Sequence, residues 1–438
     1  MRRTSPIHAA SIPVEHTKSG KAFRLARALV PFILFGFLSA FKPSEAFISP
    51  YLRTEKRMSH AVLHSQVWPV WTYANTFWLV LFIPMTMFLG SYISIAVGIV
   101  GRLLTRVSLI WGDSKHAFQL AEFFFGCATA SEYVFYGAVF SHVDTGFYPT
   151  VSSLTRASVL AAHLASALLG QLLVSCGVPY HILFYISLLA IVLSATSFLT
   201  FPGLVPTRIP FSHTNVESIK SSIKKSALAI IRPAARPTRA LVLVYAVGLA
   251  VHSLAVAYFS IILDYVDPAL SLNGLAIAVI KVAGVAGAWA SSLPVASTHL
   301  GSALFITSGL GSVMLWVAAW PIDGILPRTV ALVIDIASFA SYNFFAECVI
   351  ALTTAHLAKA AGTRHAAAVV TYTAASAFIQ TVVQVVVDEE SMKAMVGVLA
   401  VLWAVLAVTG TILGDGAERT RGDYTAILDG SDSGDQSA

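Results

Sequence analysis

Residues 42–52 read KPSEAFISPYL, and they close a hydrophobic stretch that begins near residue 26. Glu45 places a carboxylate at the end of this stretch, and Lys42 is the basic residue next to it in sequence. A charged side chain at membrane depth costs at least about 2.5–3.5 kcal/mol on insertion scales, so such residues are candidates for function. Because the stretch is long enough to cross a bilayer, we predict a membrane helix that ends in a functional carboxylate.

The whole chain has the composition of a membrane protein. Of its 438 residues, 56% are hydrophobic and 11% are charged, whereas soluble domains contain about 25% charged residues. Apolar stretches that suit membrane helices of about 20 residues recur along it. We therefore predict an all-α membrane protein with twelve transmembrane helices, at residues 26–50, 67–90, 91–111, 117–142, 148–176, 180–201, 239–266, 272–295, 300–320, 327–357, 365–387 and 393–414.

The predicted helices form two sets of six, separated by a polar connection. The predicted organisation is a cytoplasmic N-terminal tail (1–25), a first six-helix half (26–201), a cytoplasmic linker (202–238), a second six-helix half (239–414) and an acidic, disordered C-terminal tail (415–438). Lysine and arginine concentrate in the N-terminal tail and the linker, so the positive-inside rule places both termini in the cytoplasm. In transporters with two such halves, substrate binds between the halves near the middle of the membrane.

Glu132 is the strongest candidate for a binding residue inside a predicted span. It lies in SEYVFYGAVF, where Tyr136 follows four residues later on the same helical face and Phe135 follows three residues later. A carboxylate between aromatic rings suits a flat aromatic cation. The alternative is that Glu132 is neutral at this depth and forms a hydrogen bond to a neighbouring helix.

The second predicted span begins with VWPVWTY, which contains Trp68, Trp71 and Tyr73. Tryptophan and tyrosine at the start of a span are usually anchors at the membrane interface. We interpret Trp68 and Tyr73 in this way and take Trp71 as a candidate ligand contact.

The remaining ionisable residues inside the spans suggest an ion pair and a proton site. Glu122 and Arg156 lie in the fourth and fifth predicted spans, so we predict a structural or gating ion pair between them. Asp335 or Glu347 in the second half is a candidate for the titratable group of a proton-coupled carrier.

Several classes of protein are excluded by the sequence. Hydrolase, metalloprotease and nucleotide-binding motifs are absent, and no histidine–carboxylate cluster has the spacing of metal ligands. We therefore predict neither an enzyme nor a cofactor, and we expect any transport to be driven by a gradient. The basic runs flank lipid-spanning helices and lack interleaved aromatic residues, which argues against a nucleic-acid partner.

Several segments resemble one family of vitamin carriers. The motif PSE-x-F-x-x-PYL within residues 43–52, AEFFFG at 121–126, LTRASVLAAH at 154–163, LLGQLLVS at 168–175 and AAVVTYTAASAFIQTVVQVVVD at 367–388 are similar to segments of the reduced folate and thiamine carriers. The resemblance follows nearly the whole chain and places Arg156 at the arginine of the family's fifth helix. It implies a major-facilitator-type fold.

Three positions in this resemblance favour the thiamine-type members. VWTY at residues 70–73 is similar to their second helix, Glu132 stands where folate-type members have an arginine, and Gln380 stands where these have a lysine. The resemblance implies that Glu45, Trp71, Glu132 and Phe135 contact the substrate. Carboxylates in place of basic groups also suit a fixed positive charge better than the carboxylates of folate.

The sequence also departs from the family pattern. The turn between the second and third predicted spans reads FLGSYIS and lacks the family's acidic and basic pair, and two further departures lie in the second half. Ile277 occupies a position that is often acidic in the family, and Ser253 stands where thiamine-type members have an asparagine. These departures leave the cation preference intact and put the identity of the ligand in doubt. We predict a substrate site formed by Glu45, Trp71, Glu132, Phe135, Tyr136, Ser253 and Gln380.

The resulting hypothesis is a multi-pass plasma-membrane carrier, embedded in the lipid bilayer, that takes up thiamine or a related heteroaromatic cation by alternating access. A co-transported or exchanged ion is the expected partner of such a carrier. The alternatives are a carrier of reduced folates and a membrane receptor that binds its ligand without transporting it.

Overall fold

The computed structural model describes residues 18–59, 62–201, 236–266, 273–320, 326–362, 365–386 and 396–409, and their regular structure is helical. The helices of the first half are α1 (Lys18–Ala40), α2 (Ile48–Thr54), α4 (Trp68–Phe88), α5 (Ser91–Trp111), α6 (Lys115–Ala138), α7 (Tyr148–Ser175) and α8 (Tyr180–Phe198). Those of the second half are α10 (Arg236–Val266), α11 (Asn273–Ala290), the short α12 (Pro294–Thr298), α13 (Leu300–Ala319), α14 (Arg328–Ala361), α15 (His365–Val386) and a last helix, Val396–Thr409. Single turns lie at Glu45–Phe47, Leu63–Val67, Val139–His142 and Thr145–Phe147.

Among the described residues, twelve helices match the predicted membrane spans. Nine segments are long and apolar enough to cross a bilayer, Gly274–Ala290 and Val396–Thr409 are shorter apolar helices, and α4 completes the set. The second and third spans separate at Gly90, whose φ of 84° lies in the left-handed region that glycine adopts readily. The predicted linker (202–238) and the two tails lie mainly outside the described residues.

The first span differs from its prediction as one uninterrupted helix. α1 ends at Ala40, a single turn follows at Glu45–Phe47, and α2 begins at Ile48. Pro43 lies in the gap, and proline lacks the N–H that would continue a helix and also disfavours helical geometry in the residue before it. The break therefore places Glu45 on irregular backbone, where transporter helices commonly bind ligands or ions.

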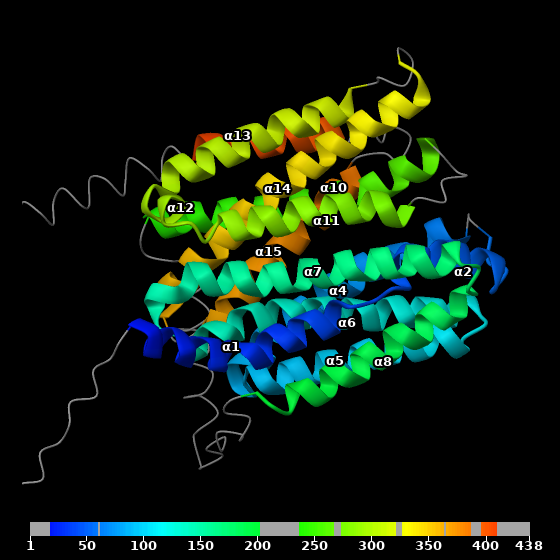
Figure 1. The fold of residues 1–438 in the computed structure, drawn as a ribbon, viewed down its shortest axis with the longest axis horizontal. Helices are drawn as coiled ribbons and strands as arrows, with labels where there is room; N and C mark the ends of the chain where they lie inside the picture. Colours follow the sequence, from blue (N-terminus) through cyan, green and yellow to red (C-terminus); the bar gives the residue numbers. More distant parts are fainter. Residues whose placement is uncertain are drawn as a thin grey trace, which may run out of the picture.

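Each half has its own apolar core. One core joins buried residues of α10, α11, α13, α14, α15 and the last helix around Trp403. A core around Tyr51 lies in the first half. A third, around Phe32, lies mainly in the first half and also includes residues of α14 and α15, such as Ala355 and Ala366. Figure 1 shows the helices of the first half, from α1 to α8, as one layer below α10, α11, α13 and α14. The halves meet where α7 packs against α11 and α14 and where α15 packs against α4 and α6.

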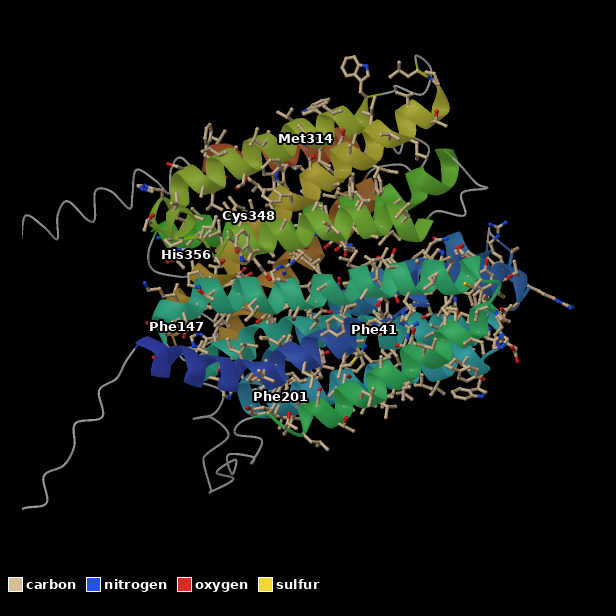
Figure 2. All side chains as sticks on the ribbon, viewed as in Figure 1. Phe41, Phe147, Phe201, Met314, Cys348 and His356 are labelled. Atoms are coloured by element: carbon tan, nitrogen blue, oxygen red, sulfur yellow. The ribbon has the colours of Figure 1, made fainter. Side chains whose placement is uncertain are left out.

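The halves are closed against each other at one end, which we term the linker end because α8 ends there and α10 begins there. The Tyr148 hydroxyl in α7 lies 3.0 Å from Nε2 of His365 in α15. Ser152 donates a hydrogen bond to the backbone carbonyl of Ala351 over 2.8 Å. Phe147 marks this end in Figure 2. Opening the linker end therefore requires these contacts between the halves to break.

Large apolar side chains cover the outer surface of the bundle (Figure 2). Val333 is 64% exposed, Phe378 is 65% exposed and Leu172 is 60% exposed. These residues come from three different helices, α14, α15 and α7. This surface suits contact with lipid chains.

Candidate functional site

A cavity lies between the two halves. The first half contributes residues from α4 and α6, and the second half contributes residues from α10 and α15. The lining residues are Trp71, Asn75, Thr129, Glu132, Tyr133, Leu249, Ser253, Thr373, Ser376, Ala377 and Gln380. The structure thus brings together Trp71, Glu132, Ser253 and Gln380, four of the seven residues predicted from the sequence.

Helical spacing explains why these residues share one cavity. On each helix the lining residues are three or four positions apart, as at Trp71 and Asn75 on α4 or Ser376 and Gln380 on α15, and such residues lie on the same face. Five further polar lining residues were not predicted from the sequence: Asn75, Thr129, Tyr133, Thr373 and Ser376. Their spacing from the predicted residues was the signal that could have found them.

Glu132 is oriented by partners on both sides of its carboxylate. The Tyr136 hydroxyl donates a hydrogen bond of 2.7 Å to Oε1, and Nη2 of Arg102 lies 3.6 Å from Oε2. The Glu132 side chain remains 27% exposed. Tyr136 lies on the same helical face as Glu132, as predicted. It holds the carboxylate by this hydrogen bond but is not one of the residues that line the cavity.

Trp71 forms an aromatic wall of the cavity. Its ring lies 6.2 Å from the ring of Phe125, and its indole N–H is buried without a hydrogen-bond partner among the described residues. Tyr73, two residues later, is 60% exposed on the outer surface. Trp71 therefore points inward while Tyr73 points outward, as expected for a ligand contact and an interfacial anchor.

Glu45 lies away from the residues that line this cavity. Lys42 Nζ is 3.4 Å from its Oε1, and Arg106 Nη2 is 3.0 Å from its Oε2. Lys42 is the basic neighbour expected from the sequence, whereas Arg106 was not expected because it lies in a separate helix, α5. Glu45 is thus the acidic member of a cluster of three charges in the first half, with Lys42 and Arg106, rather than an isolated acid.

Phe135 does not flank the Glu132 carboxylate as predicted. Its ring is 1% exposed and packs 5.1 Å from the ring of Phe35 in the core of the first half. The position three residues after Glu132 is rotated away from the cavity, and burial of an apolar ring in the core is favourable. A binding role for Phe135 is therefore not supported by its position.

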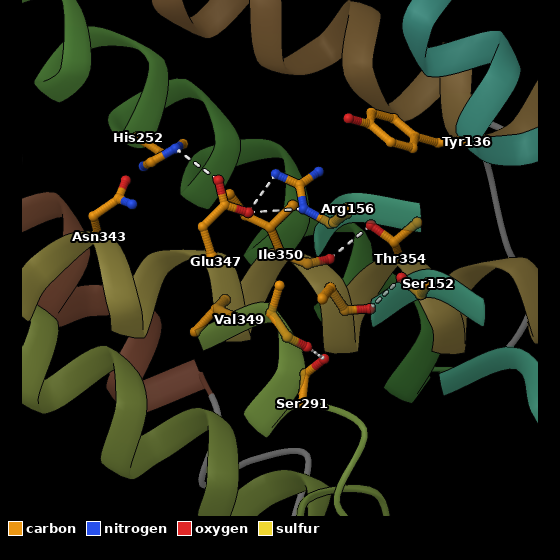
Figure 3. A network of polar contacts seen from close by, with 12 residues as sticks. Tyr136, Ser152, Arg156, His252, Ser291, Asn343, Glu347, Val349, Ile350 and Thr354 are labelled. Carbon is orange, nitrogen blue, oxygen red and sulfur yellow. Dashed lines mark hydrogen bonds and ion pairs between the residues drawn. The ribbon is translucent and has the colours of Figure 1, made fainter. Parts of the chain in front are cut away.

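The predicted ion pair between Glu122 and Arg156 is wrong. Arg156 in α7 instead pairs with Glu347 in α14, through Nη2 at 2.6 Å and Nε at 2.8 Å from Oε2 (Figure 3). Glu122 forms none of the ion pairs found among the described residues. The prediction assumed that consecutive spans pack together, whereas α7 packs chiefly against helices of the second half.

The Arg156–Glu347 pair links the two halves beside the cavity. His252 Nε2 in α10 lies 3.5 Å from Oε1 of Glu347, and the Arg156 guanidinium lies 5.4 Å from the centre of the Tyr136 ring. Tyr136 in turn holds Glu132. A continuous series of polar and aromatic contacts therefore connects Glu132 to the second half. Asp335, the other candidate for a proton site, is buried in α14 and does not line this cavity.

Comparison with known proteins gives a family match over part of the chain. The family model described as Reduced folate carrier matches residues 24–230. Thiamine transporter 2 of Mus musculus is 38% identical over 157 residues, which are 35% of this chain and 32% of that protein. Folate transporter 1 of Caenorhabditis elegans is 28% identical over 204 residues, which are 46% of this chain and 45% of that protein. The aligned segments thus span less than half the length of these relatives.

Comparison with solved structures covers nearly the whole chain. The major facilitator superfamily transporter FucP, solved in an outward conformation, superimposes with a TM-score of 0.59 at 13% sequence identity. The match covers 88% of this chain and 99% of FucP. The fold is therefore the major facilitator fold of multi-pass membrane proteins, as the resemblance implied. Residues 24–230, which contain Trp71 and Glu132, match the family described as Reduced folate carrier, and this part of the chain is similar to that family.

Proposed function

We propose that this protein transports thiamine or a related heteroaromatic cation across the plasma membrane. The observation that carries the proposal is the position of Glu132, a partly exposed carboxylate in the cavity between the halves. A carboxylate attracts a cation, and Trp71 offers a π face for a flat positive ring. The similarity of residues in the first half to a thiamine transporter supports the same substrate class.

The mechanism we propose is alternating access. The halves 26–201 and 239–414 rock about the cavity, and the linker end opens when Tyr148 separates from His365. With both termini in the cytoplasm, this opening releases substrate inward. The driving force comes from a co-transported or exchanged ion.

The second candidate is a carrier of reduced folates. The name of the matching family and the similarity to a folate transporter favour it. Against it, the central cavity presents Glu132 and Gln380, and no lysine or arginine is among its lining residues. An anionic substrate would meet the Glu132 carboxylate there, and like charges repel.

Uptake of radiolabelled substrates tests the proposal. Cells that express the chain should accumulate thiamine in preference to reduced folate, well above the amount that the protein binds. Preferential accumulation of folate would favour the second candidate. Saturable thiamine binding without accumulation would show a receptor rather than a carrier.

Replacing Glu45 with alanine should nearly abolish uptake. The change leaves Lys42 and Arg106 without their shared carboxylate, and unpaired buried charges are strongly destabilising. The measurement is thiamine uptake normalised to the amount of protein at the cell surface. Glu55→Ala, at the exposed residue after α2, is the control and should retain uptake. Full activity in Glu45→Ala would exclude a role for this charge cluster.

A further inference from the structure

Two side-chain amides line the central cavity, one from each half. Asn75 comes from α4 in the first half, and Gln380 comes from α15 in the second half. Both side chains are buried, at 8% and 6% exposed. The hydroxyl oxygens of their sequence neighbours Thr76 and Thr381 lie 3.4 Å apart, so α4 and α15 meet beside the cavity. The two amides therefore border the same ligand space from opposite halves.

Each amide has hydrogen-bonding capacity that the described part of the protein does not use. The Thr129 hydroxyl in α6 donates a hydrogen bond of 3.0 Å to Oδ1 of Asn75, which takes one of the two lone pairs of that oxygen. Among the described residues, the Nδ2 donors of Asn75 and the whole amide of Gln380 have no partner. Buried polar groups nearly always have one. Water supplies it until a ligand enters, so a well-bound ligand must replace these hydrogen bonds.

An amide offers a donor and an acceptor side by side, which selects a particular kind of ring edge. Asparagine and glutamine bind adenine in this way, because its amino group stands beside an unprotonated ring nitrogen. The amide oxygen accepts from the amino group, and the amide N–H donates to the ring nitrogen. The remaining lone pair and the Nδ2 donors of Asn75 suit this pairing. An ionised carboxylate such as that of Glu132 only accepts hydrogen bonds, so it cannot bind both atoms of such an edge.

From this arrangement we propose that Asn75 is a specificity-determining residue that binds a neutral edge of the substrate, an amino group beside a ring nitrogen. Gln380 completes the hydrogen bonds of the same amino group from the other half, and Glu132 attracts the cationic ring. This inference rests on the proposed function, since thiamine carries such an edge on its pyrimidine ring. Because Asn75 and Gln380 belong to different halves, a substrate bonded to both also links the halves across the cavity.

Binding of two probes to the purified full-length protein tests the proposal. The probes are thiamine and the analogue in which hydrogen replaces the amino group of the pyrimidine ring, so that the cationic ring and the ring nitrogens are retained. The unmodified protein should bind thiamine roughly 10-fold more tightly, because the analogue leaves a buried amide oxygen without its hydrogen bond. If thiamine binds and the analogue binds equally well, the inference is wrong and the proposed function stands. If thiamine does not bind, both are wrong.

A matched pair of variants assigns the preference to Asn75. Asn75→Leu keeps a side chain of similar size without hydrogen-bonding atoms, and it should reduce the preference for thiamine over the analogue to about 3-fold or less. The control is Asn343→Leu in α14. Asn343 is also a buried asparagine, but it donates its hydrogen bond to the Ile280 carbonyl and does not line the cavity. This control should keep the full preference. An undiminished preference in Asn75→Leu would overturn the role of this residue.

Discussion

Replacing Glu347 with glutamine should abolish transport and lower the thermal stability of the protein. Glu347 is the anionic partner of Arg156 across the two halves, at 2.6 Å, and both side chains are largely buried. Removal of one member of a buried ion pair costs about 3–5 kcal/mol, because the other charge stays buried and unpaired. The measurements are the melting temperature of the purified protein and thiamine uptake per molecule at the cell surface.

A charge swap provides the control for this prediction. The double variant Arg156→Glu with Glu347→Arg restores opposite charges between α7 and α14, and it should recover part of the stability that each single variant loses. A swap of Glu122 with Arg156 should recover nothing, since these residues are not paired in the structure. Normal stability and uptake in Glu347→Gln would contradict the assignment of this pair.

Replacing Gly137 with valine should block transport while the protein still reaches the membrane. A Cβ atom at Gly137 in α6 would overlap the backbone of Ala366 in α15, and these helices belong to different halves. Ala366 belongs to the apolar core around Phe32 that also contains Ala138, so the added side chain separates the halves at this contact, and we expect closure of the linker end to fail. Uptake should therefore be lost at a near-normal surface level, and thiamine binding should be retained.

Gly146→Val is the matched control for this experiment. Gly146 lies near the same end of the bundle, and a Cβ atom there would meet nothing within 4 Å. This variant should transport normally. Normal uptake in Gly137→Val would mean that the halves need not approach each other closely at this point.

The fold follows closely from the sequence because the membrane restricts the choice of structure. Backbone polar groups in lipid must pair within the segment, so a long apolar stretch becomes a helix. For this reason most predicted spans agree with the helices to within a few residues, as α5 (Ser91–Trp111) does. The break at Pro43 was visible as a proline in the motif, but its effect on the path of the chain depends on packing against neighbouring helices.

The site could be predicted only in part. Trp71 and Gln380 are far apart in sequence, and the family resemblance, rather than periodicity, brought both into the predicted substrate site. Contacts between helices were harder to predict from the sequence. Neither the pairing of Arg156 with Glu347 nor that of Glu45 with Arg106 follows from adjacency of spans, because the fold, not the chain order, brings the members of each pair together.

The most direct test of the account is the affinity for thiamine in Glu132→Gln, measured from the concentration dependence of uptake. Loss of one charge-assisted contact of about 1.5–3 kcal/mol should raise KM by roughly 10–100-fold. The control is Glu122→Gln. Glu122 is a buried carboxylate of the same helix that does not line the central cavity, so this variant should leave KM near that of the unmodified protein. Unchanged kinetics in Glu132→Gln at a normal surface level would remove this residue from the substrate site and contradict the proposed selection of a cation.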